Sequence, residues 1–174
     1  MKPHEREIAM SRLLSAVAFA CLLAGCAGFD GRGLAPGASA GEVEALMGPA
    51  ADKRAKGSET WVYYTRQPYG YANYVARISQ DGKLIALEQR LSDENIARIE
   101  RGKWRADDVR EEFGPPYTNI NFARMQRDIW EYRFRSLQST VPYALYVQFS
   151  PDGVVREVYT MSDPDYRLSD CCSR

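Results

Sequence analysis

The chain has 174 residues, and its 23 Lys and Arg balance 23 Asp and Glu, so the formal net charge is zero. It lacks the basic excess with which proteins bind nucleic-acid phosphates, so we expect no nucleic acid among its partners. The single histidine is His4, so the rest of the chain lacks the commonest general base and metal ligand. We therefore expect a non-catalytic protein without a metal or another cofactor.

The N-terminal segment has the features of a removable secretory signal. A basic start precedes an apolar run from Leu13 to Leu23, which is too short for a permanent membrane span. The run ends in Leu23-Ala24-Gly25-Cys26, which resembles the lipobox of bacterial lipoproteins. This resemblance implies cleavage between Gly25 and Cys26, a lipid on Cys26 and, because Ala27 rather than Asp follows, an outer-membrane anchor facing the periplasm. The alternative is an ordinary signal peptide in which Cys26 is incidental.

Two features of the chain ends stay open. Translation can begin at Met1 or at Met10, because the leader is complete from residue 10 onward. Cys171 and Cys172 are neighbours close to the C-terminus, and a disulfide between adjacent residues is strained. We expect two free thiols in a polar tail, with an intermolecular disulfide as the alternative in an oxidising compartment.

The segment after the leader indicates a linker, a helix and a small sheet. Glycines and a proline between residues 27 and 38 are typical of a flexible linker. Ser39-Ala40-Gly41-Glu42 matches a capping box, an apolar stripe follows, and Gly48-Pro49 ends the helix. We expect a polar loop over 52–58. Strands are predicted, from their aromatic and β-branched residues, over 59–65, 74–78 and 83–90.

The same order of elements then recurs. The sequence predicts a helix over 93–101 that begins after Ser92, a second short helix that ends at Gly114-Pro115, and strands over 128–135, 143–149 and 154–160. Three motifs match in order, which indicates a duplicated unit: Gly48-Pro49 with Gly114-Pro115, Trp61-x-Tyr63 with Trp130-x-Tyr132, and Asp81-Gly82 with Asp152-Gly153. We therefore predict an α+β fold of two tandem units, each with one or two short helices packed on a three- to four-stranded antiparallel sheet.

These motifs together resemble the SmpA/OmlA (BamE-like) outer-membrane lipoprotein family. The resemblance implies helices packed on an antiparallel sheet and a role in outer-membrane assembly or integrity, with the β-barrel assembly machinery as a candidate partner. The tandem arrangement also resembles the β-lactamase inhibitor protein fold. That second resemblance implies an alternative function, inhibition of a periplasmic or secreted hydrolase through a concave sheet surface.

Five segments follow from these patterns. We predict a lipoprotein signal peptide over 1–25, a flexible tether over 26–38, a first BamE-like repeat over 39–90, a second over 91–161 and a polar tail over 162–174. The membrane contact would be made by the lipid on Cys26, and proteins of the envelope would be the partners. The function predicted is that of a lipid-anchored protein acting through protein–protein contacts.

Candidate partner-binding residues are aromatic side chains around the first hairpin. Tyr63 and Tyr64 are neighbours that point to opposite faces of their strand, so one of them should leave the main core. Because Tyr is enriched in interface hot spots, we predict partner contacts at Tyr64, Tyr69, Tyr71 and Tyr74. The alternative is that these tyrosines only cover a small sheet.

Two acidic pairs were the remaining candidates for chemistry. Asp107-Asp108 and Glu111-Glu112 lie on the second short helix, whose dipole favours acids near its start. We expect them to form a solvated face rather than a catalytic dyad.

Overall fold

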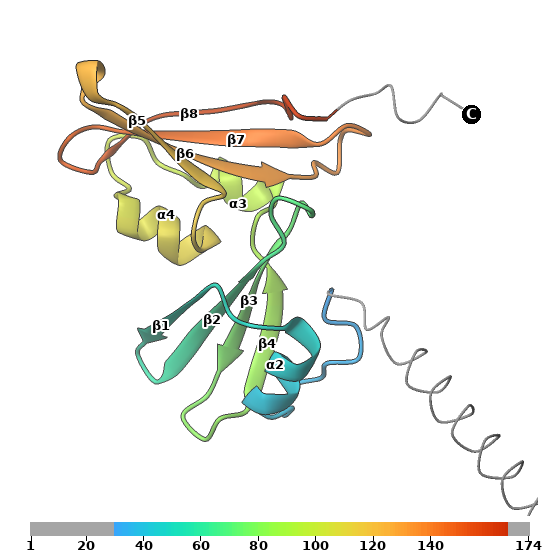
Figure 1. Ribbon diagram of the computed structural model, residues 1–174. Helices are drawn as coiled ribbons and strands as arrows, with labels where there is room; N and C mark the ends of the chain where they lie inside the picture. Colours follow the sequence, from blue (N-terminus) through green and yellow to red (C-terminus); the bar gives the residue numbers. More distant parts are fainter. Residues whose placement is uncertain (1–29, 167–174) are drawn as a thin grey trace, which may run out of the picture.

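The computed structural model describes residues 30–166 and shows two four-stranded antiparallel sheets with short helices (Figure 1). This confirms the predicted α+β class. The predicted signal peptide with Gly25 and Cys26, and both C-terminal cysteines, lie outside the described residues. Within 30–166, no helix has the length and apolar content needed to cross a bilayer.

The first unit contains one helix and one sheet. Helix α2 (Ala40–Met47) is followed by strands β1 (Asp52–Lys56), β2 (Glu59–Thr65), β3 (Asn73–Ile78) and β4 (Leu84–Gln89), which pair in chain order. The capping box forms as predicted, because Ser39 Oγ accepts from Glu42 N and the Glu42 carboxylate accepts from Ser39 N.

The second unit repeats this plan with an additional short helix. Its elements are α3 (Asp93–Ala97), α4 (Ala106–Phe113), β5 (Thr118–Phe122), a 3-10 turn (Ala123–Met125), β6 (Arg127–Phe134), β7 (Tyr143–Phe149) and β8 (Val155–Ser162). The strands again pair in chain order. Helix α3 is shorter than the predicted helix over 93–101.

Strands β1 and β5 were not expected from the sequence, and the prediction of a polar loop over 52–58 is wrong. Both are edge strands, so only one side of each is hydrogen-bonded, β1 to β2 and β5 to β6. Edge strands tolerate charged side chains, and β1 reads Asp-Lys-Arg-Ala-Lys. The apolar alternation that identifies a half-buried strand is therefore absent from it.

Each unit has its own hydrophobic core between a helix and one face of its sheet, which we call the inner face. In the first unit, Val43 and Met47 of α2 pack on buried side chains of the sheet: Val62, Tyr64, Ala76, Ile78 and Leu84. Leu34 and Ala38 also pack there, and Gly37 N donates to Leu84 O. Leu34 and Ala38 of the predicted tether are therefore packed on the first unit.

The core of the second unit is larger. Val109 and Phe113 of α4, together with Leu91, pack on the inner face of its sheet: Tyr132, Phe134, Leu145, Val147, Phe149 and Val155. Trp130 packs against this core, with its ring 4.8 Å from that of Phe149.

Backbone hydrogen bonds confirm the duplication. Ala40 N donates to Gly82 O in the first unit, and Ala106 N donates to Gly153 O in the second. Each sheet also carries a bulge at the corresponding place, at Arg77/Ile78 and at Gln148/Phe149. Such shared irregularities are positional features of a fold, so the two units can be aligned residue by residue.

This alignment corrects one predicted match. Ala51 N donates to Tyr63 O, and Tyr117 N donates to Glu131 O, so Tyr63 corresponds to Glu131 and not to Tyr132. The predicted Trp-x-Tyr equivalence is therefore one residue out of register. Because a one-residue shift moves every side chain to the other face, Trp61 and Tyr63 lie on the outer face of their sheet, whereas Trp130 and Tyr132 lie on the inner face.

Candidate interaction surface

The outer face of the first sheet is covered by α4, which belongs to the second unit and lies between the two sheets (Figure 1). Tyr63 is 1% exposed, and its hydroxyl donates to Glu111 O at 2.7 Å. Asn73 Nδ2 donates to Phe113 O at 2.8 Å. Gly114 packs so closely on the Tyr63 ring that an added Cβ would lie 2.8 Å from Tyr63 Cδ1. Tyr63 therefore leaves the first core, as predicted for one of the two tyrosines, but is buried again by α4.

Ion pairs surround this contact. Lys56 pairs with Glu111, Arg110 Nε lies 3.1 Å from Asp52 Oδ2, and Arg90 Nη2 lies 2.5 Å from Glu112 Oε2. The expectation of a solvated acidic face is wrong for Glu112, which is 9% exposed. Its carboxylate is buried because Arg90 neutralises it at the edge of the contact between units.

A second charged group supports the outer face from within the first sheet. Arg77 donates to both carboxylate oxygens of Glu59, at 2.8 and 2.7 Å. These hydrogen bonds, with a further one from Trp61 Nε1 at 3.0 Å, lower the pKa of Glu59 to about 2. The Glu59 carboxylate is thereby held in its charged form.

The outer face of the second sheet carries no helix, since α3 and α4 lie on its other side (Figure 1). We call this surface the open face. It is defined by one apolar residue set from all four strands: Ile120, Phe122, Ile129, Tyr146, Tyr159 and Met161. Phe122, Tyr159 and Met161 are 45%, 41% and 49% exposed. The rings of Tyr146 and Tyr159 stack with centroids 5.1 Å apart.

The open face also carries a buried charged cluster, because Glu131 lies beside Tyr146 and Arg133 beside Ala144 in the sheet register. The Arg133 guanidinium, 8% exposed, lies 3.0 Å from Glu131 Oε1, 3.1 Å from Asp163 Oδ1 and 2.6 Å from Asp165 Oδ2. It also lies 4.5 Å from the centroid of the Tyr117 ring. Because these contacts satisfy Arg133 internally, the cluster fixes the end of β8 and offers little free charge to a ligand.

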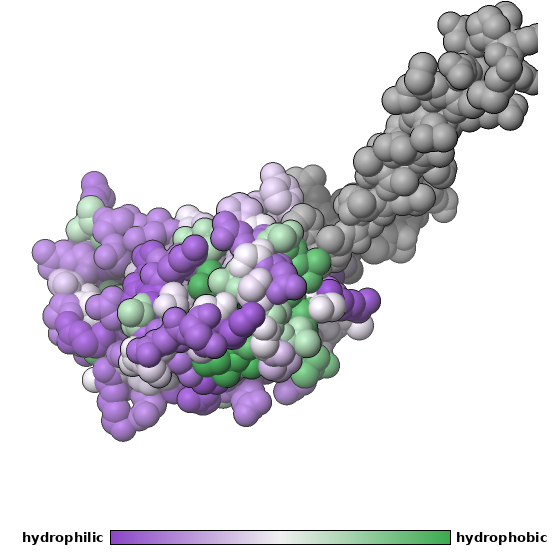
Figure 2. Space-filling model, turned by 90° about the horizontal axis from the view of Figure 1, so that it is seen from below, coloured by the Kyte–Doolittle hydropathy of each residue, from purple (hydrophilic) through white to green (hydrophobic). Residues whose placement is uncertain are grey.

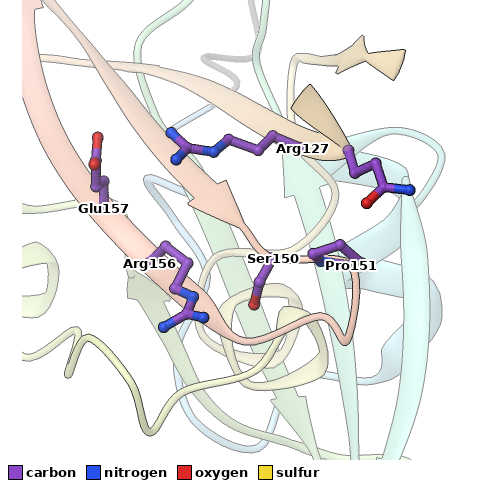
Figure 3. Close-up of a pocket in the computed structure, with 6 residues that line it drawn as sticks. Arg127, Ser150, Pro151, Arg156 and Glu157 are labelled. Atoms are coloured by element: carbon purple, nitrogen blue, oxygen red, sulfur yellow. The ribbon is translucent and has the colours of Figure 1, made fainter. Parts of the chain in front are cut away.

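One border of the open face is a shallow polar depression of about 420 Å³. Figure 3 shows Arg127 on β6, Arg156 and Glu157 on β8, and Ser150-Pro151 in the hairpin between β7 and β8. Ligand pockets are mostly apolar and enclosed, whereas this depression is polar and open. Across residues 30–166, no three His, Cys, Asp or Glu side chains come together as a metal site.

The predicted tyrosines do not form one exposed surface. Tyr64 is 3% exposed in the first core, and Tyr74 packs against the same core. Tyr69 is 99% exposed in the loop between β2 and β3. Tyr71 lies with its ring 5.3 Å from the Arg135 guanidinium. Burial, followed by the nearby charge of Asp163 and a hydrogen bond to it, raises the pKa of Tyr71.

The sequence did contain a signal for the open face. Ile120 and Phe122 alternate with Asn119 and Asn121, and Thr160 separates Tyr159 from Met161. That period of two is typical of a strand with one apolar face, but strand β5 was not recognised, and the last strand was predicted only as far as residue 160, before Met161.

The fold and the open face define an α+β protein built from a duplicated helix-and-sheet unit, in which one sheet face is covered internally and the equivalent face is not. No protein-family model and no curated protein sequence matches the chain. Among solved structures, it is similar to YjgB, a DUF4309 family protein from Bacillus subtilis, at 14% identity over 72% of this chain and 79% of that one, with a TM-score of 0.30.

A second similar structure is a "putative beta-lactamase inhibitor protein" from Streptococcus mutans. The identity is 14%, the match covers 76% of this chain and 87% of that one, and the TM-score is 0.28. Superpositions at this level assign no function to the present chain.

Proposed function

We propose that this protein is a non-catalytic interaction protein of the cell envelope whose partner-binding surface is the open face. The observation that carries the proposal is the exposure of Phe122, Tyr159 and Met161 on one sheet face. Phe122 lies on edge strand β5 and the other two on edge strand β8, with buried Ile129 and Tyr146 between them. Exposed apolar residues gathered on one surface commonly mark interaction sites. Aromatic residues and Met are also enriched at protein interfaces.

The proposed location follows from the N-terminal sequence. Leu23-Ala24-Gly25-Cys26 supports a lipid anchor on Cys26 in the outer membrane, with the protein facing the periplasm. Dual or triple acylation holds a protein firmly at a bilayer, whereas one short chain does not. The resemblance to SmpA/OmlA lipoproteins supports a role in outer-membrane assembly or integrity, with the β-barrel assembly machinery as the candidate partner.

Inhibition of a periplasmic or secreted hydrolase is the second candidate function. It is favoured by the form of the surface, because exposed Tyr159 lies on a sheet rather than on a loop and is held by stacking on buried Tyr146. A rigid aromatic surface binds with a small loss of conformational entropy.

Affinity purification of the tagged full chain from envelopes tests both candidates. Met161→Asp should reduce partner recovery at least about tenfold, because a charge in an apolar contact costs more than about 1.4 kcal/mol. Ile85→Asp is the matched control, since Ile85 is a 37% exposed aliphatic residue on β4, away from the open face.

The captured partner separates the candidates. Recovery of barrel-assembly components supports the first, and a stoichiometric hydrolase with lost activity supports the second. Equal recovery by the parent chain and Met161→Asp would contradict the assignment of the open face.

A further inference from the structure

The internal duplication shows what kind of element the open face accepts. The outer face of the first sheet binds α4, and the repeat aligns that face with the open face. The same alignment matches α4 with α2, because Gly114 and Gly48 end the two helices with the same φ of 78°. Gly114 is packed on Tyr63, whereas an added Cβ on Gly48 would meet nothing within 4 Å. One copy of the chain therefore holds a sheet face without a helix and an uncovered counterpart of the helix that covers such a face. On that sheet face Glu131, which aligns with Tyr63, is buried in its ion pair with Arg133.

At the positions of two ion pairs of the internal contact, both aligned residues, one on the open face and one on α2, are apolar. Lys56 pairs with Glu111; the aligned residues are Phe122 on the open face and Ala45 on α2. Arg90 pairs with Glu112; the aligned residues are Met161 and Leu46. Ala45 is exposed and Leu46 is half-buried, and hydrophobic residues are also exposed on the side of the molecule that carries the first unit (Figure 2).

The two remaining ion pairs of the internal contact are also absent from the aligned surfaces, although Glu44 keeps one exposed charge on α2. Arg54 lies 3.9 Å from Asp107, and the aligned residues are Ile120 and Gly41. The partners Asp52 and Arg110 align with Thr118 and Glu44, which keeps one polar residue on each side. Apolar side chains on both surfaces favour association by removing that area from water.

The carbonyl groups at the C-terminal end of α2 are also compatible with such a contact. In the internal contact, Phe113 O is satisfied by Asn73, but the aligned residue on the open face is Ala144, which has no side-chain donor. The carbonyl that corresponds to Phe113 O is Met47 O, and it already accepts from Arg66 Nη2 at 3.0 Å. Docking of α2 would therefore leave no helix carbonyl unpaired at this position.

We propose that the partner of the open face is a second copy of this chain, which docks its α2 there as α4 docks on the first sheet. This inference rests on the proposed function, since it names the partner of the same surface. The contact is head-to-tail, because helix and sheet face are different surfaces of one copy. Such contacts build rings or open arrays rather than twofold dimers.

Photo-crosslinking of the full chain in intact cells tests the proposal. Met161→p-benzoylphenylalanine should give an adduct with twice the mass of the chain, in which the crosslink maps to α2. The control is the variant Tyr69→p-benzoylphenylalanine, because Tyr69 is exposed and lies outside the proposed contact. Leu46→Asp should reduce the adduct at least about tenfold, whereas Ile85→Asp should leave it unchanged.

A charge exchange makes the test specific for the pairing. Phe122→Lys alone should abolish the adduct, and adding Ala45→Glu should restore it, because the double variant copies the Lys56–Glu111 pair. An adduct of Met161→p-benzoylphenylalanine with a different protein would overturn self-docking while supporting the proposed function. An adduct yield no higher than that of the Tyr69 control would contradict both.

Discussion

At the scale of single residues, the pair Arg90–Glu112 shows how much the contact between units depends on exact partners. The side chains are 16% and 11% exposed. Arg90 Nε and Glu112 Oε1 are buried without a hydrogen-bond partner. Buried ion pairs repay their desolvation poorly, although removal of one partner is costly because the other charge stays buried. This pair therefore contributes more to the specificity with which α4 packs on the first sheet than to the free energy of unfolding.

Glu112→Leu should lower the free energy of unfolding by about 1–3 kcal/mol, because it leaves the Arg90 guanidinium with Glu88, 2.7 Å away, as its remaining anion. The double variant Arg90→Met/Glu112→Leu should recover to within about 1 kcal/mol of the parent chain, since it copies the residues aligned in α2 and β8. Urea unfolding measures both. Equal destabilisation by the single and double variants would contradict the pairing.

Glu59 makes the stability depend on pH. Its pKa falls from 4.5 to about 2 on folding, so it stabilises the fold above about pH 4.5 and loses this effect as the pH falls toward 2. Glu59→Gln should destabilise the protein at about pH 7, and its difference from the parent chain should shrink at about pH 3. Unfolding free energies at the two pH values check this; a constant difference would exclude the linkage.

At the scale of elements, α4 belongs to two cores. Val109 and Phe113 pack into the second unit, while Glu111 and Gly114 contact the outer face of the first sheet. The helix is only eight residues long, and isolated helices of that length are unstable. Its stability must therefore come from packing on both sides.

Gly114→Ala and Gly48→Ala form a matched pair that isolates this packing. Both glycines have φ of 78°, so either alanine should cost about 1 kcal/mol in backbone strain. Only Gly114→Ala places a Cβ 2.8 Å from the Tyr63 ring, and we expect a further cost of about 1–3 kcal/mol. Thermal or urea unfolding gives the difference in destabilisation between the two variants. Equal destabilisation would mean that the Tyr63 ring moves aside without cost and would contradict the prediction.

The sequence predicted those elements whose side chains show a clear period. The helix from Ala40 and strands β2 and β7 were predicted closely, because capping residues or alternation mark them. Strand β1 was missed because its residues are charged. The open face was missed because strand β5 was not recognised and the last strand was predicted to end at residue 160, before Met161. Tertiary contacts from α4, which local patterns do not encode, decide that Tyr63 is buried.

At the scale of the whole molecule, two units share one plan but differ in what covers their outer faces. The duplication was predictable from three motifs in the same order, because turn and cap residues keep their places when side chains diverge. Which face of each sheet would stay open was not predictable, since it depends on how the units pack. The proposed function at this scale combines a proposed lipid anchor on Cys26 with exposed apolar side chains on one sheet face.

Cys26→Ser should abolish fatty-acid labelling and leave the precursor uncleaved, because the proposed lipid is attached through the thiol of Cys26. Metabolic labelling of the full chain, with Cys21→Ser as the control inside the proposed leader, measures this. Unchanged labelling of the Cys26→Ser chain would contradict the anchor.

The packing of α4 on the first sheet also affects the order in which the protein folds during synthesis. Chains are synthesised from the N-terminus at about 5–20 residues per second, and α4 follows β4 in the sequence. All four strands of the first sheet are therefore synthesised before α4, the helix that covers Trp61, Tyr63 and Val75. Exposed apolar surface in such intermediates promotes aggregation and chaperone binding. The half-made chain is thus the form of this protein that most needs protection during its biogenesis.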